Sequence, residues 1–416
     1  MSGAERDALE RLRAALDGAR LIYLQAGVGE PLALRGLLAA SPGLLEGRTI
    51  VSCLLPGMNE FDYAALSPHA RVETFLLPAA SRASFEAGRV RVRPLPYSQI
   101  ADWLAQGPAP DLAIVQTSLP DAAGRASLGP CADFAPIVAP RARARLAFVN
   151  AAWPATATGP ALDAASLDVT IRFDGPFVTA GPEREDLVLE SIGRSVAGLI
   201  PDGAAIQTGI GGAPARALFA LCARRGLRVR SGMVTPGYQA LDEAGALDPD
   251  AEHVTGMALG PEAFMQWAAG RFVFADARRT HGAAGLAATK ALHTINSALE
   301  VDLFGQTNLE WRGGRLYSGL GGAPDFARAA RRSPGGRAIL ALPATARGGA
   351  SRIVARLAAP SVGLARDDAD LVVTEFGVAD LRGADLDERA ARLTAIAAPA
   401  HRAPLAAAWR EVRRSL

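Results

Sequence analysis

The chain has 416 residues, of which 50% are apolar and 21% charged, so two or three folded domains are expected and wholesale disorder is excluded. Its formal net charge of +2 at pH 7 gives no reason to expect nucleic acid or an anionic membrane as a partner. Three cysteines without Cys-x-x-Cys spacing and five histidines without ligand spacing argue against a disulfide framework and a metal site.

The first residues, MSGAERDALERLRAAL, predict a charged amphipathic helix without the apolar core of a signal peptide. No apolar run reaches the length needed to span a bilayer. The unpaired pattern of the cysteines fits a reducing compartment. We therefore expect a cytoplasmic protein with no membrane partner.

Short apolar runs typical of buried strands alternate with helical patterns along the whole chain. The predicted strands are 21–25, 49–54, 113–116, 146–150, 205–207, 227–230, 272–274, 338–342 and 371–374. This alternation predicts an α/β fold with mostly parallel sheets.

One unit of sequence occurs twice, at residues 22–39 and 205–222. Each copy reads as a strand, a Gly-x-Gly turn, a proline at the first helical position and an apolar helix. Two such copies predict two similar α/β domains. The boundary is expected in the turn-rich stretch 174–182, ahead of a helix over 185–200, which gives domains of residues 1–180 and 181–416.

A glycine loop, Gly319 to Gly322, lies ahead of a helix predicted from about Asp325, and a second loop contains Arg347. Glycines let backbone N–H groups approach an anion, and arginine supplies the matching charge. The pattern therefore favours a phosphate-bearing ligand. The competing interpretation is ordinary turns with solvated arginines.

Further motifs follow one another in order along the chain. They are IPDG at 200–203, QTGIGG at 207–212, INSALEVD at 295–302, GQTN at 305–308 and VTEFGVADLRG at 373–383, with weaker ones, QAGVGEP and SLG, at 25–31 and 127–129. Together with 317–349 they resemble the acetyl-CoA hydrolase/transferase family, class I CoA-transferase-like proteins that include 4-hydroxybutyrate and acetate CoA-transferases.

The resemblance implies two CoA-transferase-like domains with the active site in the cleft between them. It implies a coenzyme A thioester as substrate, with no tightly bound cofactor and no metal. The partners would be an acyl-CoA and, as an option, a small carboxylic acid. A homodimer is one option for the assembly.

By the same resemblance, one loop would line the pantetheine arm and offer N–H groups to the thioester oxygen. Its residues are Gly209, Ile210, Gly211, Gly212 and Ala213. Ser318 and Gly322 would flank the nucleotide arm, Asn308 would lie in the same pocket, and Arg347 would bind a CoA phosphate.

Members of the family use a glutamate that attacks the thioester and becomes a glutamyl-CoA thioester. The matching segment here is Arg230-Ser231-Gly232-Met233, and the family glutamate falls on Gly232. The catalytic residue is therefore unknown. Ser231, which would need a base beside it, and Glu300, for which a structural role is the competing interpretation, are the remaining candidates.

The retained loops and the missing glutamate together favour thioester hydrolysis, acyl transfer or thioester-enolate chemistry over ping-pong CoA transfer. Two alternatives stay open. One is an acyl-CoA:carboxylate CoA-transferase that uses another carboxylate, and the other is a non-catalytic protein that binds CoA esters.

Overall fold

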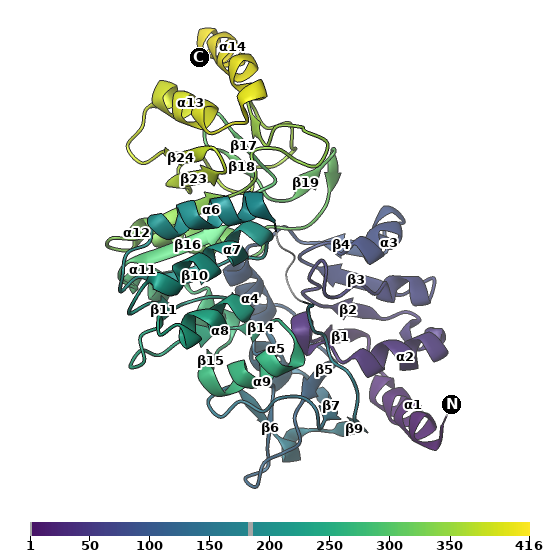
Figure 1. Ribbon diagram of the computed structural model, residues 1–416. Coiled ribbons are helices and arrows are strands. Elements are labelled where there is room, and N and C mark those ends of the chain that lie inside the picture. The colour runs from purple at the N-terminus through teal and green to yellow at the C-terminus, as the bar shows by residue number, and fades with distance from the viewer. Residues whose placement is uncertain (1, 182–185) are drawn as a thin grey trace. The chain divides into compact units, whose positions relative to one another are not determined.

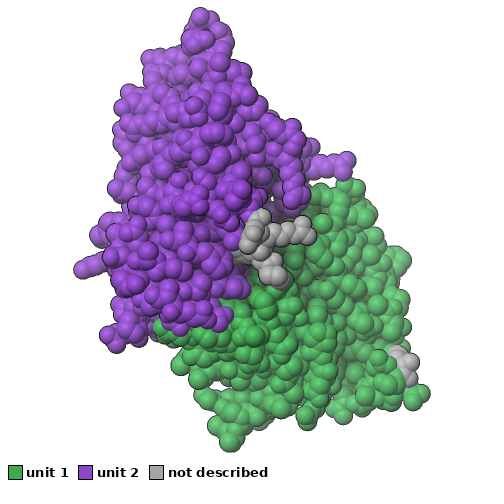
Figure 2. Space-filling model, in the orientation of Figure 1, with its two compact units in different colours: residues 1–181, 254–280 green, residues 182–253, 281–416 purple. Residues whose placement is uncertain are grey.

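The computed structural model describes residues 2–181 and 186–416, and these form two compact units. Unit 1 comprises Met1–Gly181 and Val254–Thr280, and unit 2 comprises Pro182–His253 and His281–Leu416 (Figure 2). Residues 254–280, called here the return segment, thus belong to unit 1 although they follow a part of unit 2 in the sequence. The expected division into residues 1–180 and 181–416 does not include this return. Residues 182 and 185, at the expected boundary and at the expected helix start, lie outside the described residues.

Unit 1 is built on a parallel sheet with the strand order β4-β3-β2-β1-β5-β7-β9. Its strands are β1 Leu21–Leu24, β2 Thr49–Val51, β3 Arg71–Thr74, β4 Val90–Val92, β5 Leu112–Thr117, β7 Ala144–Asn150 and β9 Val169–Phe173. Every residue of β5, LAIVQT, is buried, as expected for a central parallel strand covered on both faces.

Seven helices and several short strands complete the described part of unit 1 (Figure 1). The helices are α1 Gly3–Leu16, α2 Leu32–Ala40, α3 Arg82–Glu86, α4 Tyr97–Gln106, α5 Ala135–Val138, α9 Glu262–Arg271 and α10 Ala277–Thr280. The short strands are β6 Arg125–Ser127, which pairs with β8 Ala161–Asp163, β13 Val254–Thr255, which pairs with β15 Val273–Phe274, and β14 Met257–Ala258.

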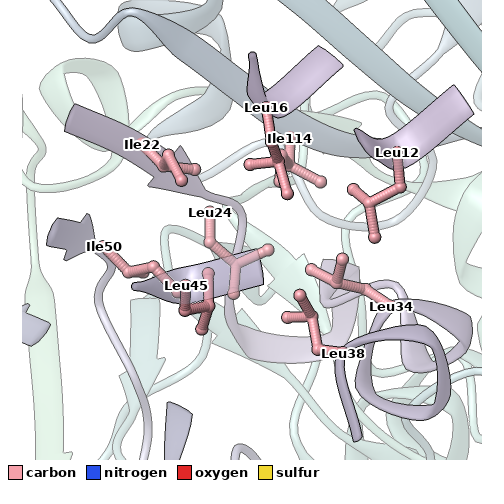
Figure 3. A pocket seen from close by; sticks show the side chains of 9 residues that line it. All are labelled: Leu12, Leu16, Ile22, Leu24, Leu34, Leu38, Leu45, Ile50 and Ile114. Atoms are coloured by element: carbon pink, nitrogen blue, oxygen red, sulfur yellow. The ribbon is translucent and has the colours of Figure 1, made fainter. Parts of the chain in front are cut away.

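Apolar side chains from α1, α2, the 3-10 helix Pro42–Leu45 and three strands converge on one face of this sheet (Figure 3). They enclose a cavity of about 10 Å³, lined by Leu12, Leu16, Ile22, Leu24, Leu34, Leu38, Leu45, Ile50 and Ile114. A space this small with an apolar lining holds no ordered water, so it is a packing gap and not a ligand site.

The return segment is tied to the rest of unit 1 by backbone hydrogen bonds. The Ala132 N–H donates to the Gly256 carbonyl at 2.9 Å, and the Ala258 N–H donates to the Pro130 carbonyl at 2.9 Å. The Ala277 N–H donates to the Asp133 carbonyl at 2.8 Å. The segment after β6 and the return segment therefore stabilise each other.

Unit 2 has a six-stranded sheet with the order β11-β10-β16-β21-β23-β24, parallel except for β24. Its strands are β10 Ala205–Thr208, β11 Arg228–Val229, β16 Leu292–Asn296, β21 Arg337–Ala341, β23 Leu371–Thr374 and β24 Gly377–Asp380. The prediction of an α/β fold with mostly parallel sheets is confirmed.

The helices of unit 2 are α6 Leu187–Gly198, α7 Gly212–Ala220, α8 Pro236–Glu243, α11 Ala283–Ala288, α12 Ala323–Arg332, α13 Leu386–Ala395 and α14 Pro399–Arg414. Its short strands are β12 Met233–Val234, β17 Glu300–Asp302, β18 Thr307–Asn308, β19 Trp311–Arg312, β20 Arg315–Leu316 and β22 Ile353–Val354. α6 packs along α7, and α11 along α12 (Figure 1). Right-handed crossovers that run in opposite directions from the β10–β16 pair place α7 and α12 on opposite faces of the sheet.

Each predicted strand overlaps an observed one, but the two repeats differ from the prediction at their prolines. Pro31 is the N-cap of α2, and Pro214 is the third residue of α7. The central strand β16, LHTIN, has no counterpart among the predicted strands, because His293 and Thr294 interrupt its apolar pattern although both are buried.

Candidate active site

Five parallel strands of unit 2 end at one edge of its sheet, called here the carboxyl edge and formed by the residues that follow β10, β11, β16, β21 and β23. The chain leaves β10 toward β11 and leaves β16 toward β21, so the strand order reverses between β10 and β16. In open α/β sheets ligands bind outside the carboxyl ends of the strands at this point of reversal. The glycine loop 209–213 directly follows β10.

Within this loop the residues divide into two kinds. The Gly209 N–H donates to the Ile295 carbonyl at 2.8 Å, so it extends the sheet and is not free for a ligand. Gly211 has a φ of 138° and is the N-cap of α7, where no side chain of the described residues caps the helix. The first N–H groups of a helix have no acceptor within it, so Gly212 and Ala213 are the donors that point out of the helix end.

The backbone of the loop packs directly on the end of β16. A Cβ atom on Gly209 would collide with the side-chain oxygen of Asn296, and one on Gly211 would lie 3.3 Å from the Cβ of Ser297. Asn296 and Gln207 exchange amide hydrogen bonds of 3.1 and 3.2 Å, both side chains being buried. This amide pair holds β10 and β16 together at the point where the strand order reverses.

The segment 230–233 follows β11 at the same edge. The hydroxyl of Ser231 donates to the Met233 carbonyl at 2.7 Å and reaches the Thr208 carbonyl at 3.4 Å. Ser231 is 1% exposed. Its hydroxyl therefore links β10 to the start of β12, which is a structural role. Gly232 is half-buried.

Next to Gly232 lies a histidine that the motifs did not single out, His281. It precedes α11, and its ring packs on Phe326 of α12 with 4.8 Å between centroids and 58° between planes. A Cβ on Gly232 would come within 2.7 Å of the imidazole, and a Cβ on Gly322 within 2.5 Å. Burial lowers the pKa of His281 to about 3, so the ring is neutral at physiological pH.

Gly322, predicted to flank the nucleotide, is the N-cap of α12, with a φ of −91° that any residue can adopt. Space and not backbone conformation requires glycine here, because the His281 ring occupies the volume that a side chain would need. Ser318, four residues earlier, is half-buried, and its N–H reaches the Glu310 carbonyl at 3.3 Å.

Glu300 and Asn308 are paired directly across β17 and β18. The Asn308 amide donates to Glu300 Oε2 at 2.9 Å and to the Trp311 carbonyl at 2.8 Å. Its oxygen accepts from the N–H groups of Glu310 and Trp311. Asn308 therefore has all its polar atoms in use and orients Glu300.

Arg352 is influenced by two acids, Glu300 in β17 and Glu375 at the end of β23. Burial lowers the pKa of Arg352, and Arg312 lowers it further, whereas Glu375 and Glu300 raise it. Glu375 accepts a hydrogen bond of 2.8 Å from the Ala344 N–H. This hydrogen bond gives Glu375 a structural role at the end of β23.

Arg347 is exposed in a turn after β21, where Gly348 and Gly349 have φ values of 91° and 84°. Among the described residues no carboxylate lies within ion-pair distance of its guanidinium. The side chain is therefore available to an anion from solvent.

Residues 2–181 and 186–416, which the structure describes, contain no group of three His, Cys, Asp or Glu side chains that could hold a metal ion. None of the helices within them is long and apolar enough to cross a membrane.

Comparison with known proteins gives a consistent result. A model of the acetyl-CoA hydrolase/transferase C-terminal domain matches residues 260–409. The 4-hydroxybutyrate coenzyme A transferase of Clostridium kluyveri is 30% identical over 397 residues, which cover 93% of this chain and 92% of that protein. The succinyl-CoA:cyclohexane-1-carboxylate CoA transferase of Geobacter metallireducens is 30% identical over 399 residues, covering 93% and 91%.

Solved structures agree over the same length. RipA from Yersinia pestis has a TM-score of 0.89 at 26% identity and covers 99% of this chain and 100% of its own. The 4-hydroxybutyrate CoA-transferase of Porphyromonas gingivalis has a TM-score of 0.80 at 28% identity, covering 98% and 97%. Since sequence and fold match along almost the whole chain, the chain belongs to the acetyl-CoA hydrolase/transferase family of enzymes.

Proposed function

We propose that this enzyme acts on an acyl-CoA thioester at the carboxyl edge of the unit 2 sheet, without a glutamyl-CoA intermediate. One observation carries the proposal: position 232, where the resemblance places the family glutamate, is a glycine with the imidazole of His281 against it. Neither glycine nor a neutral imidazole can form the mixed anhydride on which glutamyl-CoA chemistry depends.

The end of α7 supports thioester chemistry at this edge. The N–H groups of Gly212 and Ala213 lie at the positive end of a helix dipole, next to the loop of Gly211. Donors held in place by the fold stabilise negative charge that develops on a carbonyl oxygen. Water attack, acyl transfer to another nucleophile and formation of a thioester enolate all develop such charge.

The named relatives transfer CoA between acids, so a second candidate is CoA transfer through another carboxylate. Glu300 is the residue that the structure favours for it, because it is half-buried and oriented by Asn308. The hydrogen bonds that hold it to Asn308 also fit a purely structural acid, and we therefore place this candidate second.

The test is a panel of acyl-CoA esters, with and without added carboxylates, in which released CoA thiol is followed with time. Hydrolysis or acyl transfer releases CoA without a carboxylate acceptor. CoA transfer gives a new CoA ester that depends on the acceptor. Tight binding of acyl-CoA without turnover of any ester would contradict the proposal and favour a non-catalytic binder.

Borohydride reduction separates the two chemical routes. A glutamyl-CoA thioester is reduced to an alcohol, which peptide mass mapping detects. We expect the protein incubated with acyl-CoA and borohydride to keep its mass and its activity. A reduced side chain at Glu300 would show that a carboxylate has replaced the missing nucleophile, and the first proposal would be wrong.

A further inference from the structure

A cavity of about 290 Å³ lies on the face of the unit 1 sheet opposite to the packing gap beside α1 and α2. Tyr23, Val51 and Glu73 line it from one row across β1, β2 and β3. Side chains alternate between the two faces of a strand, so these three point away from Ile22 and Ile50, which line the gap. Small-ligand pockets begin at about 300 Å³, so this cavity has the size of a ligand site.

The opposite wall of the cavity comes from two helices and from the residues ahead of β5. Trp103 and Leu104 belong to α4, Val138 belongs to α5, and Pro108 and Pro110 precede β5. Every residue that lines the cavity belongs to unit 1, and most of them are uncharged. A lining of this kind favours an apolar ligand body.

The charged residues of the lining are Glu73 and Arg93. Arg93 follows β4, and its backbone N–H donates to the Thr74 carbonyl at 2.8 Å, which places it beside β3. Its Nε and Nη2 donate to Glu73 Oε2 at 3.0 and 2.7 Å, and its guanidinium lies 4.6 Å from the centre of the Trp103 ring. The salt bridge and the ring together hold the guanidinium at the cavity.

The charge at this end of the cavity is not balanced by Glu73 alone. Nη1 of a second arginine, Arg91, lies 3.8 Å from Glu73 Oε1, so two arginines share one carboxylate and leave a net charge of about +1. Among the described residues no acceptor binds Arg93 Nη1, and 40% of the Arg93 side chain is exposed. A monoanion can therefore bind this nitrogen without displacing Glu73.

We propose that the cavity binds a carboxylic acid with an apolar body, such as a medium-chain fatty acid. The carboxylate would accept hydrogen bonds from Arg93 Nη1, and the chain would lie against Trp103, Leu104 and Val138. At about 30 Å³ for each water-sized group, the space holds about ten non-hydrogen atoms. The candidate active site is built from unit 2, so this acid would occupy a second site, whichever reaction the enzyme catalyses.

The ligand class is tested by calorimetry on the full chain with octanoate, which has about the size of the cavity. We expect saturable binding about 5- to 10-fold tighter than that of 1-octanol, because the alcohol lacks the charge-assisted hydrogen bond. Acetate at the same concentration should not displace octanoate, because it lacks the apolar body. Absence of saturable octanoate binding would overturn the proposal.

The role of Arg93 is tested by Arg93→Gln, which should reduce the preference for octanoate over 1-octanol to less than about 2-fold. The matched control is Arg125→Gln. Arg125 is another arginine of unit 1 in an ion pair, 2.9 Å from Asp121, but it does not line the cavity. The control should keep the preference. Equal losses in the two variants would show that only net charge matters, and the proposed carboxylate contact would be wrong.

The place of binding is tested by filling the cavity from two helices separately, with Leu104→Trp and with Val138→Phe. Thermal unfolding identifies the variants that remain folded, since an added side chain can also overpack the core. A folded variant should bind octanoate at least about 10-fold more weakly and still bind CoA as the unmodified protein does. Unchanged octanoate affinity in a folded variant would overturn the site. Because octanoate binding is measured without a CoA ester, this outcome is independent of the proposed function.

Discussion

At the scale of single residues, Arg347 gives the most direct test of CoA binding. Its guanidinium is exposed beside two glycines, where a phosphate can approach both the charge and the backbone. We predict that Arg347→Ala weakens CoA binding by about 1–2 kcal/mol, because a charge-assisted hydrogen bond at an exposed site is lost. The loss should shrink as salt is raised, which calorimetry at two ionic strengths measures.

The matched control for Arg347 is Arg225→Ala. Arg225 is also an exposed arginine of unit 2, but it precedes β11 and so lies at the opposite edge of the sheet. The control should leave CoA affinity unchanged. Equal effects of the two changes would mean that only the net charge of the protein matters.

A second residue-scale prediction concerns Asp133 in unit 1. Burial raises its pKa to about 7, a hydrogen bond of 3.3 Å from the Tyr97 hydroxyl lowers it, and Asp276 raises it. Among the described residues Oδ1 has no hydrogen-bond partner, as a protonated carboxyl without an ion-pair partner allows. The folded carboxyl is therefore neutral below about pH 7.

The sign of the pH dependence follows from the unfolded chain, in which an aspartate ionises near 3.8. Between these two values the unfolded state has lost a proton that the folded state keeps, so stability falls as pH rises toward 7 and then levels off. Each pH unit within the window is worth up to about 1.4 kcal/mol. Urea unfolding of the native protein and of Asp133→Asn from pH 4.5 to 8 should show the variant gaining relative stability with pH. Parallel curves would contradict a raised pKa.

The residues of the candidate site differ in how far sequence could identify them. The glycine loop after β10 is recognisable from its spacing, and the structure places it at the carboxyl edge. The commitment of the Gly209 N–H to Ile295 depends on a neighbouring strand from a distant part of the chain. His281 approaches Gly232 and Gly322 only through folding, and an isolated histidine among four others carries no local signal of that contact.

At the scale of elements, α6 packs closely on α7, the helix that begins at the glycine loop. A Cβ on Gly193 of α6 would come 2.7 Å from the Arg216 carbonyl carbon and 3.0 Å from the Ala217 nitrogen, both in the backbone of α7. Backbone atoms cannot move aside as a side chain does. We predict that Gly193→Ala destabilises the protein by about 1–3 kcal/mol and weakens CoA binding, because α7 and its first N–H groups are displaced.

Gly198→Ala provides the comparison within the same helix. No atom of the described residues lies within 4 Å of a Cβ at this position, and alanine favours the helix by up to about 1 kcal/mol. Chemical denaturation and CoA calorimetry on both variants separate close helix packing from helix propensity. If Gly193→Ala were as stable as Gly198→Ala, α6 would not set the position of α7.

Elements with a continuous apolar pattern were predictable, and those that bury polar residues were not. The strands 113–116, 338–342 and 371–374 are nearly uninterrupted apolar runs and correspond to β5, β21 and β23. β16 contains His293 and Thr294, whose burial depends on neighbouring strands. Periodicity within a short window cannot reveal such burial.

At the scale of the whole molecule, the two sheets were predictable from the repeat of strand, glycine turn and helix. The return of 254–280 to unit 1 was not. Its stabilising contacts are backbone hydrogen bonds to residues 130–133, more than a hundred positions earlier. Backbone groups are the same in every residue, so the sequence carries no mark of such a pairing.

The return of 254–280 also constrains how this chain can recombine with its relatives. A hybrid gene with one junction near residue 181 would join the first segment of unit 1 to a foreign strand pair in place of its own β13 and β15. The backbone bonds at Ala132 and Ala258 would then depend on a loop that evolved beside another partner. Exchange of a whole unit between two related genes needs three junctions. Recombination is therefore expected to keep units 1 and 2 of one protein together, and not to exchange them as separate modules.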